Sequence, residues 1–152
     1  MRAGRPRRAG GFTLIELMVV LVVAGVLLSL VSLSGGGNAE RALRYEAERV
    51  AQLLALAREE AQVLGTPIRF EANSERYRFL VRQDRQWRLI DDQDLRERQW
   101  EQPTRVRIER ADGRAEIEFG RDAVDIPFTL RLSRETSAVA IAANGLGAFA
   151  VQ

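Results

Sequence analysis

Carboxylates, hydroxyls and guanidinium groups are the only side chains in this sequence that are suited to chemistry. Its 152 residues include no His and no Cys, and all 23 basic residues are Arg. Thiol, imidazole and lysine nucleophiles are therefore excluded, as are the zinc, haem and iron–sulfur sites that depend on imidazole or thiolate ligands. Most enzyme mechanisms therefore lack their usual residues, and we expect no cofactor and no metal site of these kinds.

One carboxylate, that of Glu16, lies inside an apolar run over residues 12–33. Residues 1–11, which precede it, carry four Arg and no acid. A helix of that length spans roughly 33 Å at about 1.5 Å per residue, enough to cross a ~30 Å hydrocarbon layer. The positive flank predicts that residues 1–11 stay cytoplasmic and that everything after residue 33 lies on the far side. A carboxylate in hydrocarbon costs about 2.5–3.5 kcal/mol, so Glu16 needs a partner or another reason to be there.

Two ordinary interpretations compete for this segment. A secretory signal peptide would be cut near Ser34, but its apolar region is normally about 7–15 residues long and uncharged. A simple signal anchor of a periplasmic binding module would place Glu16 near the membrane interface and would keep residues 1–11.

The segment also has a specific resemblance. Residues 10–20 read GGFTLIELMVV, which resembles the signal of type IV prepilins and type II secretion pseudopilins, G-F-T-L-[IL]-E-[LV]. The resemblance implies that a prepilin peptidase cuts between Gly11 and Phe12 and methylates the new amine of Phe12. It also implies that Glu16 meets the Phe12 ammonium of a neighbouring subunit in a filament and so selects the register. The filament-core helix would then present Leu14, Ile15, Leu17, Val20, Leu21 and Leu27.

The elements that follow should position this segment on a folded head. Residues 34–38, SGGGN, predict a flexible break. An amphipathic helix is predicted over residues 39–64, ending at Gly65. Its apolar positions alternate by four and three residues, which favours packing on its own domain; they are Leu43, Ala47, Val50, Leu54, Ala57, Ala61 and Leu64.

From residue 65 onward the apolar period changes to two, which is typical of strands. Turn signals at 73–74, 112–113 and 144–145 separate the runs. We therefore expect an α+β, pilin-like fold in which a long N-terminal helix carries an antiparallel sandwich-like head over residues 65–152. The predicted strands are Pro67–Ala72, Arg76–Arg82, Trp87–Asp91, Thr104–Arg110, Arg114–Phe119, Phe128–Ser133, Ala138–Asn144 and Ala148–Val151.

Two loops in the head contain residue types that are also found in ligand-binding loops. Asp91, Asp92 and Asp94 form the densest acidic cluster, but the third ligand and the glycine of a calcium-binding loop are missing. We expect a solvated loop there. The stretch 145–147, Gly-Leu-Gly, is too short for a phosphate-binding loop and predicts a hairpin turn.

The remaining arginines alternate with acids along the head, as in Arg107/Glu109 and Arg114/Glu116. Such alternation predicts a mixed, solvated surface, and we expect no nucleic-acid partner. Trp87 and the tryptophan at position 100 are expected to pack in the core or at a sheet edge.

The end of the sequence discriminates among families that share the N-terminal signal. Residues 126–132, IPFTLRL, followed by 138–147, resemble the C-terminal half of the type II secretion protein H family. This implies a minor pseudopilin of the inner membrane with a periplasmic head, a structural subunit and not an enzyme. It also implies the prepilin peptidase, the major pseudopilin, other minor pseudopilins and an inner-membrane secretion platform as partners. Minor pilins of type IV pili, the FimT/FimU type, remain the alternative, although the uncharged tail 147–152 counts against DNA uptake.

Overall fold

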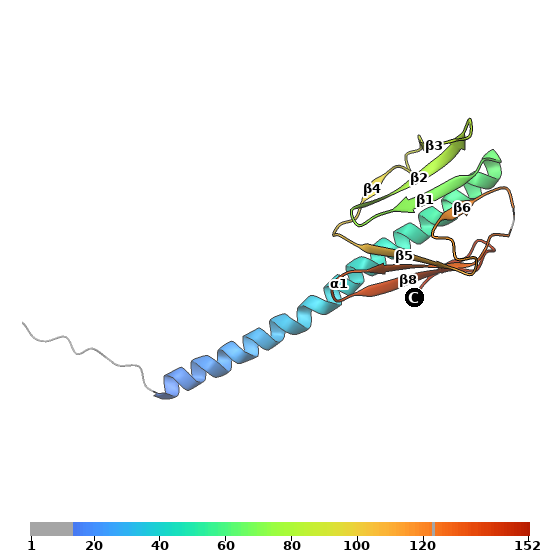
Figure 1. Ribbon diagram of the computed structural model, residues 1–152. Coiled ribbons are helices and arrows are strands. Elements are labelled where there is room, and N and C mark those ends of the chain that lie inside the picture. The colour runs from blue at the N-terminus through green and yellow to red at the C-terminus, as the bar shows by residue number, and fades with distance from the viewer. Residues whose placement is uncertain (1–13, 123) are drawn as a thin grey trace, which may run out of the picture. The chain divides into compact units, whose positions relative to one another are not determined.

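The computed structural model describes residues 14–122 and 124–152, and within the helix the side chains of residues 26–36 lie outside that description. In this described part of the chain, one helix is followed by strands (Figure 1). The elements are α1 (Leu14–Leu64), β1 (Ile68–Ala72), β2 (Arg76–Gln83), β3 (Gln86–Leu89), β4 (Arg98–Gln99), β5 (Arg105–Arg110), β6 (Ile117–Phe119), β7 (Phe128–Ser133), β8 (Ala138–Ala143) and β9 (Phe149–Val151).

The helix α1 differs from its prediction at residues 34–38, where its backbone is helical without interruption. Each glycine lowers helix stability by about 1 kcal/mol relative to Ala, but glycine introduces no clash, and the segment has no Pro to remove a hydrogen bond. The predicted break is therefore not a break in the helix. The boundary between the two compact units of the chain nevertheless falls here, between Gly35 and Gly36.

Among the residues described by the structure, no helical stretch is both long enough and apolar enough to cross a membrane. Residues 12 and 13 and the side chains of residues 26–33, which belong to the predicted span 12–33, lie outside that description.

The unit that begins at Gly36 contains two antiparallel sheets, as predicted. One has the order β3-β2-β1-β6, with β4 also paired to β2, and the other has the order β5-β7-β8-β9. Each of the eight predicted strands corresponds to an observed one within a few residues. The short β4 was not predicted, because two residues are too few to show a periodic pattern.

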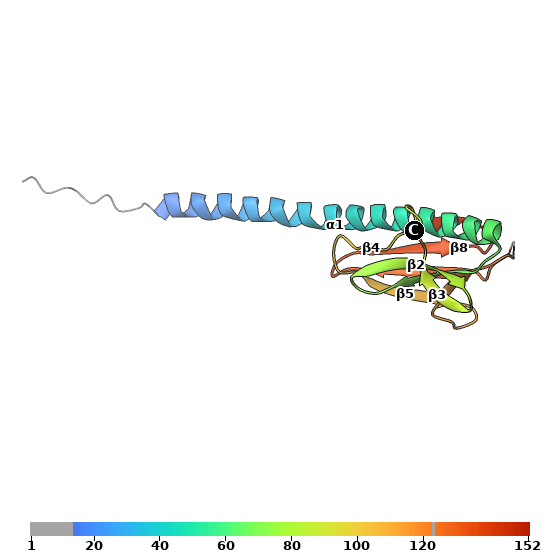
Figure 2. The ribbon, with the colours of Figure 1, turned by 90° about the horizontal axis from the view of Figure 1, so that it is seen from above.

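A single apolar core joins residues 39–64 of α1 to both sheets. Figure 2 shows this part of α1 lying along one side of the sheets. Six of the seven predicted inner positions of the helix are completely buried, namely Leu43, Ala47, Val50, Leu54, Ala57 and Ala61. The seventh, Leu64, is 51% exposed because the helix ends there. The sheets complete the core with side chains such as Phe70, Phe79, Leu130 and Ile141.

The turn between β2 and β3 shows a local conflict between residue type and backbone. Gln83 pairs with Gln86, so the loop has two residues, and both have positive φ, 51° at Asp84 and 65° at Arg85. Positive φ at both positions defines the type I′ turn, which favours Asn-Gly or Asp-Gly. A side chain in this conformation costs roughly 1 kcal/mol.

We expect Arg85→Gly to raise the free energy of unfolding by about 0.5–1 kcal/mol, because glycine relieves the strain at φ 65°. Chemical denaturation of the full chain in detergent, followed by tryptophan fluorescence, measures the change. Arg85→Ala is the matched control, since it removes the guanidinium but keeps the Cβ that causes the strain. Equal stability of the two variants would contradict this account.

Candidate functional site

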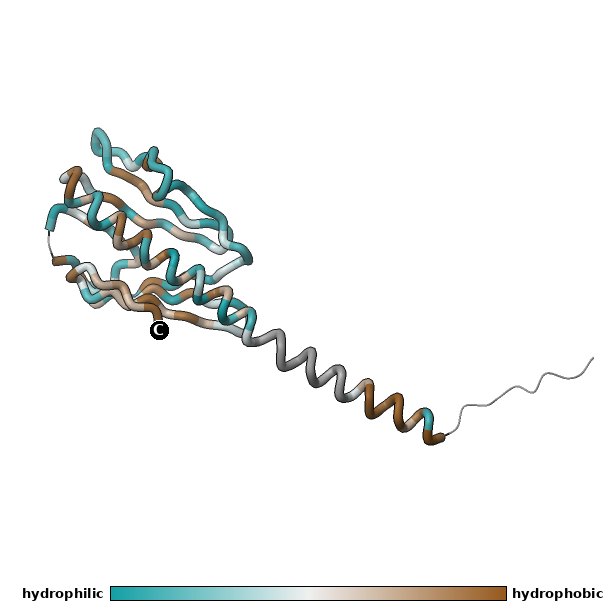
Figure 3. Tube along the Cα trace, turned by 180° about the vertical axis from the view of Figure 1, so that it is seen from behind, coloured by the Kyte–Doolittle hydropathy of each residue, from teal (hydrophilic) through white to brown (hydrophobic). Residues whose placement is uncertain are grey.

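The first described turns of α1 form an apolar surface that nothing in the described chain covers. All the large apolar residues between positions 14 and 23 have exposed fractions between 51% and 80%. They occupy every side of the helix, and Figure 3 shows the stretch as strongly hydrophobic. A helix that is apolar all round is stable when it is buried in a membrane or in a bundle of other helices. The exposed residues are Leu14, Ile15, Leu17, Met18, Val19, Val20, Leu21, Val22 and Val23.

Glu16 is the only charged residue on this surface and lies in the first turn of α1. Within the described residues its carboxylate has no hydrogen bond and no ion pair. A helix N-terminus attracts negative charge by about 0.3–1 kcal/mol, which offsets only part of the cost of placing a carboxylate in an apolar layer. This carboxylate is therefore available to a cation outside the described chain.

The structure places five of the predicted filament-core residues together on this exposed stretch: Leu14, Ile15, Leu17, Val20 and Leu21. The predicted cleavage and methylation residues, Gly11 and Phe12, and the side chain of Leu27 lie outside the described residues.

The head contains a buried ion pair that the sequence pattern did not predict. Glu46 on α1 accepts a hydrogen bond from the Arg134 guanidinium, which lies 88 residues away along the chain. The two side chains are only 5% and 7% exposed. The other carboxylate oxygen of Glu46 accepts from the backbone N–H of Glu101 at 2.8 Å, and Arg134 Nε donates to Thr104 Oγ1 at 3.0 Å. This network fastens the helix to the β4–β5 connection and to the β7–β8 turn.

The burial of Glu46 could have been predicted from its position in the sequence. It stands three residues after Leu43 and four before Val50, so it belongs to the apolar row of the helix. An acid in such a row must find a partner when it is buried. The identity of the partner had no sequence signal, because Arg134 simply follows a strand.

A second group of contacts ties Arg121 and Asp125 to the end of α1 and to the glycine that follows it. Arg58 Nε donates to Asp125 Oδ2 at 2.6 Å, and Arg121 Nε donates to the carbonyl of Gly65 at 3.0 Å. Gly65 has φ 63°, the left-handed conformation in which helices commonly end, and the guanidinium satisfies its carbonyl. The head therefore holds the C-terminal part of α1 at both ends.

The two tryptophans pack as predicted. Trp100 is 6% exposed, its Nε1 donates to the Asn73 carbonyl at 2.8 Å, and its ring lies 4.6 Å from that of Tyr77. Burial raises the pKa of the Tyr77 hydroxyl, and the nearby Arg98 opposes that shift. Trp87 is half-buried, with the Arg69 guanidinium 4.2 Å from its ring centre.

In the acidic loop and in the loop at residues 145–147, the polar side chains stabilise turns. Asp92 Oδ1 accepts the backbone N–H groups of Asp94 and Leu95 at 2.8 and 3.0 Å. No group of three or more acidic side chains in the described part of the chain is arranged to hold a metal ion. Residues 145–147 lie in the predicted hairpin turn between β8 and β9, where Asn144 Oδ1 accepts the N–H of Leu146 at 2.8 Å.

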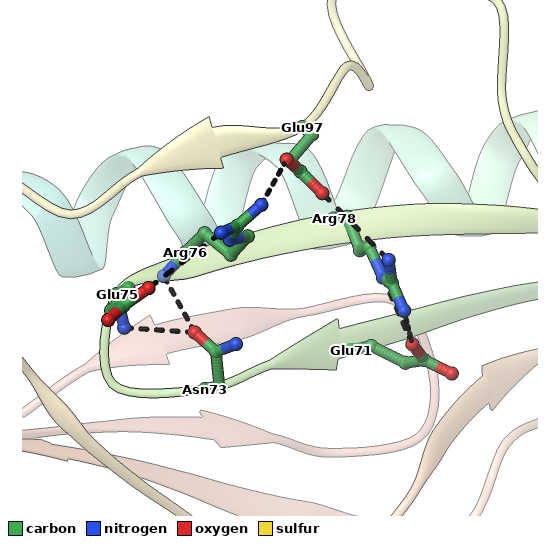
Figure 4. Close-up of polar contacts among 6 residues, drawn as sticks. All are labelled: Glu71, Asn73, Glu75, Arg76, Arg78 and Glu97. Atoms are coloured by element: carbon green, nitrogen blue, oxygen red, sulfur yellow. Dashed lines mark hydrogen bonds and ion pairs between the residues drawn. The ribbon is translucent and has the colours of Figure 1, made fainter.

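The outer face of the β1–β2 sheet carries the predicted mixture of charges. Arg78 contacts Glu71 at 2.9 Å and Glu97 at 3.9 Å, and Arg76 contacts Glu97 at 3.1 Å (Figure 4). These balanced, solvated pairs contribute little stability and give the outer face of this sheet no dominant sign.

Elsewhere in the head, a hydrogen bond from Arg110 lowers the pKa of Asp112.

Comparison with known proteins gives consistent findings. Residues 6–32 match the model of the prokaryotic N-terminal methylation motif, and residues 46–147 match that of the family described as Type II transport protein GspH. The chain is 50% identical over 62 residues to the type II secretion system protein H of Pseudomonas aeruginosa. That match covers 40% of this chain and about a third, 33%, of the relative.

The fold resembles a solved structure, that of the minor pseudopilin EpsH from the type 2 secretion system of Vibrio cholerae. The TM-score is 0.58, and the match covers 71% of this chain and 94% of the other at 18% sequence identity. At that identity the likeness shows the pilin-like fold, a helix packed on antiparallel sheets, which confirms the predicted fold class.

Proposed function

The chain belongs to the Type II transport protein GspH family, and from this membership we propose that it is a minor pseudopilin. It would be a structural, non-enzymatic subunit of the type II secretion pseudopilus, which helps to export folded proteins across the outer membrane. Its partners would be the prepilin peptidase, the major pseudopilin, other minor pseudopilins and the inner-membrane secretion platform.

The observation that carries this proposal is the exposed apolar stretch of α1 together with Glu16, which has no partner among the described residues. Such an apolar surface must be kept from water, both before and after the subunit enters a filament. Before assembly, lipid covers it as part of a single span over residues 12–33 in the bacterial inner membrane, with the head in the periplasm. After assembly, neighbouring helices cover it, and side chains such as Leu17 and Val20 exchange lipid for protein contacts.

The role of Glu16 follows from a new charge that processing would create. Cleavage between Gly11 and Phe12 produces an α-amine, and a single N-methylation leaves that nitrogen basic and cationic. In the filament the amine of Phe12 on one subunit would pair with the Glu16 carboxylate of another. Because an unpaired charge in an apolar bundle is costly, only registers that bring the two together are favoured.

The intact mass of the protein extracted from membranes tests this processing. We expect a mass that lacks residues 1–11 and carries one added methyl group on Phe12. A Gly11→Val variant should keep the full chain, whereas Gly10→Ala is the control that should be processed normally. The mass of the unprocessed chain, or of one cut near Ser34, would rule out the prepilin assignment.

A deletion strain distinguishes the two filament systems. A secretion pseudopilin predicts that exported enzymes accumulate in the periplasm. Loss of twitching or DNA uptake with normal export would instead indicate the type IV pilus minor pilin.

A further inference from the structure

The outer face of the β5-β7-β8-β9 sheet carries a cationic border that none of the contacts described above uses. Arg105 and Arg107 on β5 and Arg131 on β7 line one groove, together with small residues of β8 such as Ala138 and Ala140. The three arginines therefore lie next to a part of the sheet surface where the side chains are small. Since β5 pairs only with β7 among the described strands, this border is also the edge of the sheet.

Few acids among the described residues compensate the charges on this border. Arg107 lies directly opposite Arg131 in the β5–β7 register, and like charges in that position repel. Glu109 relieves Arg131 through an ion pair of 3.0 Å. Arg105 and Arg107 are exposed and, within the described residues, have no ion pair. The head thus presents two adjacent, exposed cations that no acid in the described residues pairs with.

The spacing of these cations defines the partner that would fit. Arg105 and Arg107 are two residues apart on one strand, so their side chains leave the same face about 7 Å apart. An extended peptide also presents alternate side chains on one face at this spacing. Two carboxylates at alternate positions could therefore each accept hydrogen bonds from one guanidinium, a charge-assisted contact that arginine forms well.

Nucleic acid fits this surface less well. Binding of single strands depends on aromatic side chains for base stacking, and none lines this groove.

We propose that the border formed by Arg105, Arg107 and Arg131 docks an extended acidic segment of a partner protein, with carboxylates at alternate positions facing Arg105 and Arg107. This inference concerns the head alone and holds whether or not the chain acts in secretion.

The test measures binding of fluorescent peptides to the full chain in detergent micelles by anisotropy. The probe is an octapeptide of alternating Glu and Thr, and it is compared with a blocked peptide of the same composition, Glu-Glu-Thr-Thr repeated twice, in which no two Glu are two residues apart. We expect the alternating peptide to bind the unmodified chain at least about fivefold more tightly, because only it places carboxylates at alternate positions on one face when extended.

Arg105→Gln/Arg107→Gln should weaken binding of the alternating peptide by at least about tenfold. The matched control is Arg88→Gln/Arg96→Gln, which removes two exposed arginines elsewhere on the head and should change binding less than about twofold. Thermal unfolding of both variants confirms that each is folded; loss of the like-charge pair should leave the first at least as stable as the original.

Several results would overturn the proposal. They are no binding of the alternating peptide, equal binding of the alternating and blocked peptides, or an equal loss in the control variant. Tighter binding of an oligothymidine of the same charge would assign the surface to nucleic acid instead.

Discussion

Replacing Arg134 with Met is expected to lower the free energy of unfolding by about 3–5 kcal/mol. The Arg134 and Glu46 side chains are 7% and 5% exposed, so the variant leaves a carboxylate buried with one backbone N–H donor, that of Glu101. It also removes the donor to Thr104, whose residue is completely buried. Since domains of this size are stable by roughly 5–15 kcal/mol, the loss would be a large share of the total.

The double variant Glu46→Leu/Arg134→Met separates the network from simple loss of packing. Two apolar side chains of similar volume leave no buried charge, so the double variant should recover most of the stability lost in the single one. Arg131→Met is the matched control. Arg131 is on β7, the strand that Arg134 directly follows, but its ion pair with Glu109 is exposed. Loss of that pair should cost less than about 1 kcal/mol.

Urea denaturation of the full chain in detergent, followed by tryptophan fluorescence, measures all of these variants. Trp100 reports on the same region, because the residue after it supplies the N–H that Glu46 accepts. A cost for Arg134→Met no greater than that of Arg131→Met would show that the buried pair does not hold the helix to the head.

Local patterns allowed much of this fold to be predicted from the sequence. The alternation of apolar residues located the strands, and the row from Leu43 to Ala61 located the buried face of the helix. The pattern could not report contacts between distant segments. Glu46 and Arg134 are 88 residues apart, and their meeting depends on how the sheets pack on the helix.

Other departures have local causes. The turn at Asp84 and Arg85 was not among the predicted turn signals because it lacks the glycine that such turns usually have. The helix continues through residues 34–38 because glycine weakens a helix without blocking it. At the N-terminal site, residue types and spacing indicated Glu16 and the apolar residues around it. Their exposure in the single chain had to come from the structure.

The largest functional effect is expected from Glu16→Gln. Glutamine keeps nearly the same size but, in the pairing proposed above, would not neutralise the Phe12 amine of a neighbouring subunit. An ammonium left unpaired in an apolar bundle costs about 3–5 kcal/mol, which corresponds to a loss of incorporation of roughly a hundredfold or more. The fraction of subunit in sheared filaments, relative to the membrane fraction, measures this loss.

Membrane insertion should respond to Glu16→Gln in the opposite direction. The variant removes the cost of placing a carboxylate in hydrocarbon, so insertion and cleavage should be at least as efficient as in the original chain. A general defect of the helix would instead lower insertion and incorporation together. Leu17→Ile, a change of shape at an adjacent exposed position, is the control that should affect both only slightly.

A charge-conserving variant separates the effect of the charge from that of side-chain volume. Glu16→Asp keeps the carboxylate but shortens its reach by one methylene, so incorporation should fall between that of the original chain and that of Glu16→Gln. This order would tie the effect to the charge and its position rather than to side-chain volume. Normal incorporation of Glu16→Gln would mean that register in the filament is set by the apolar side chains alone, and the exposed carboxylate would then need another explanation.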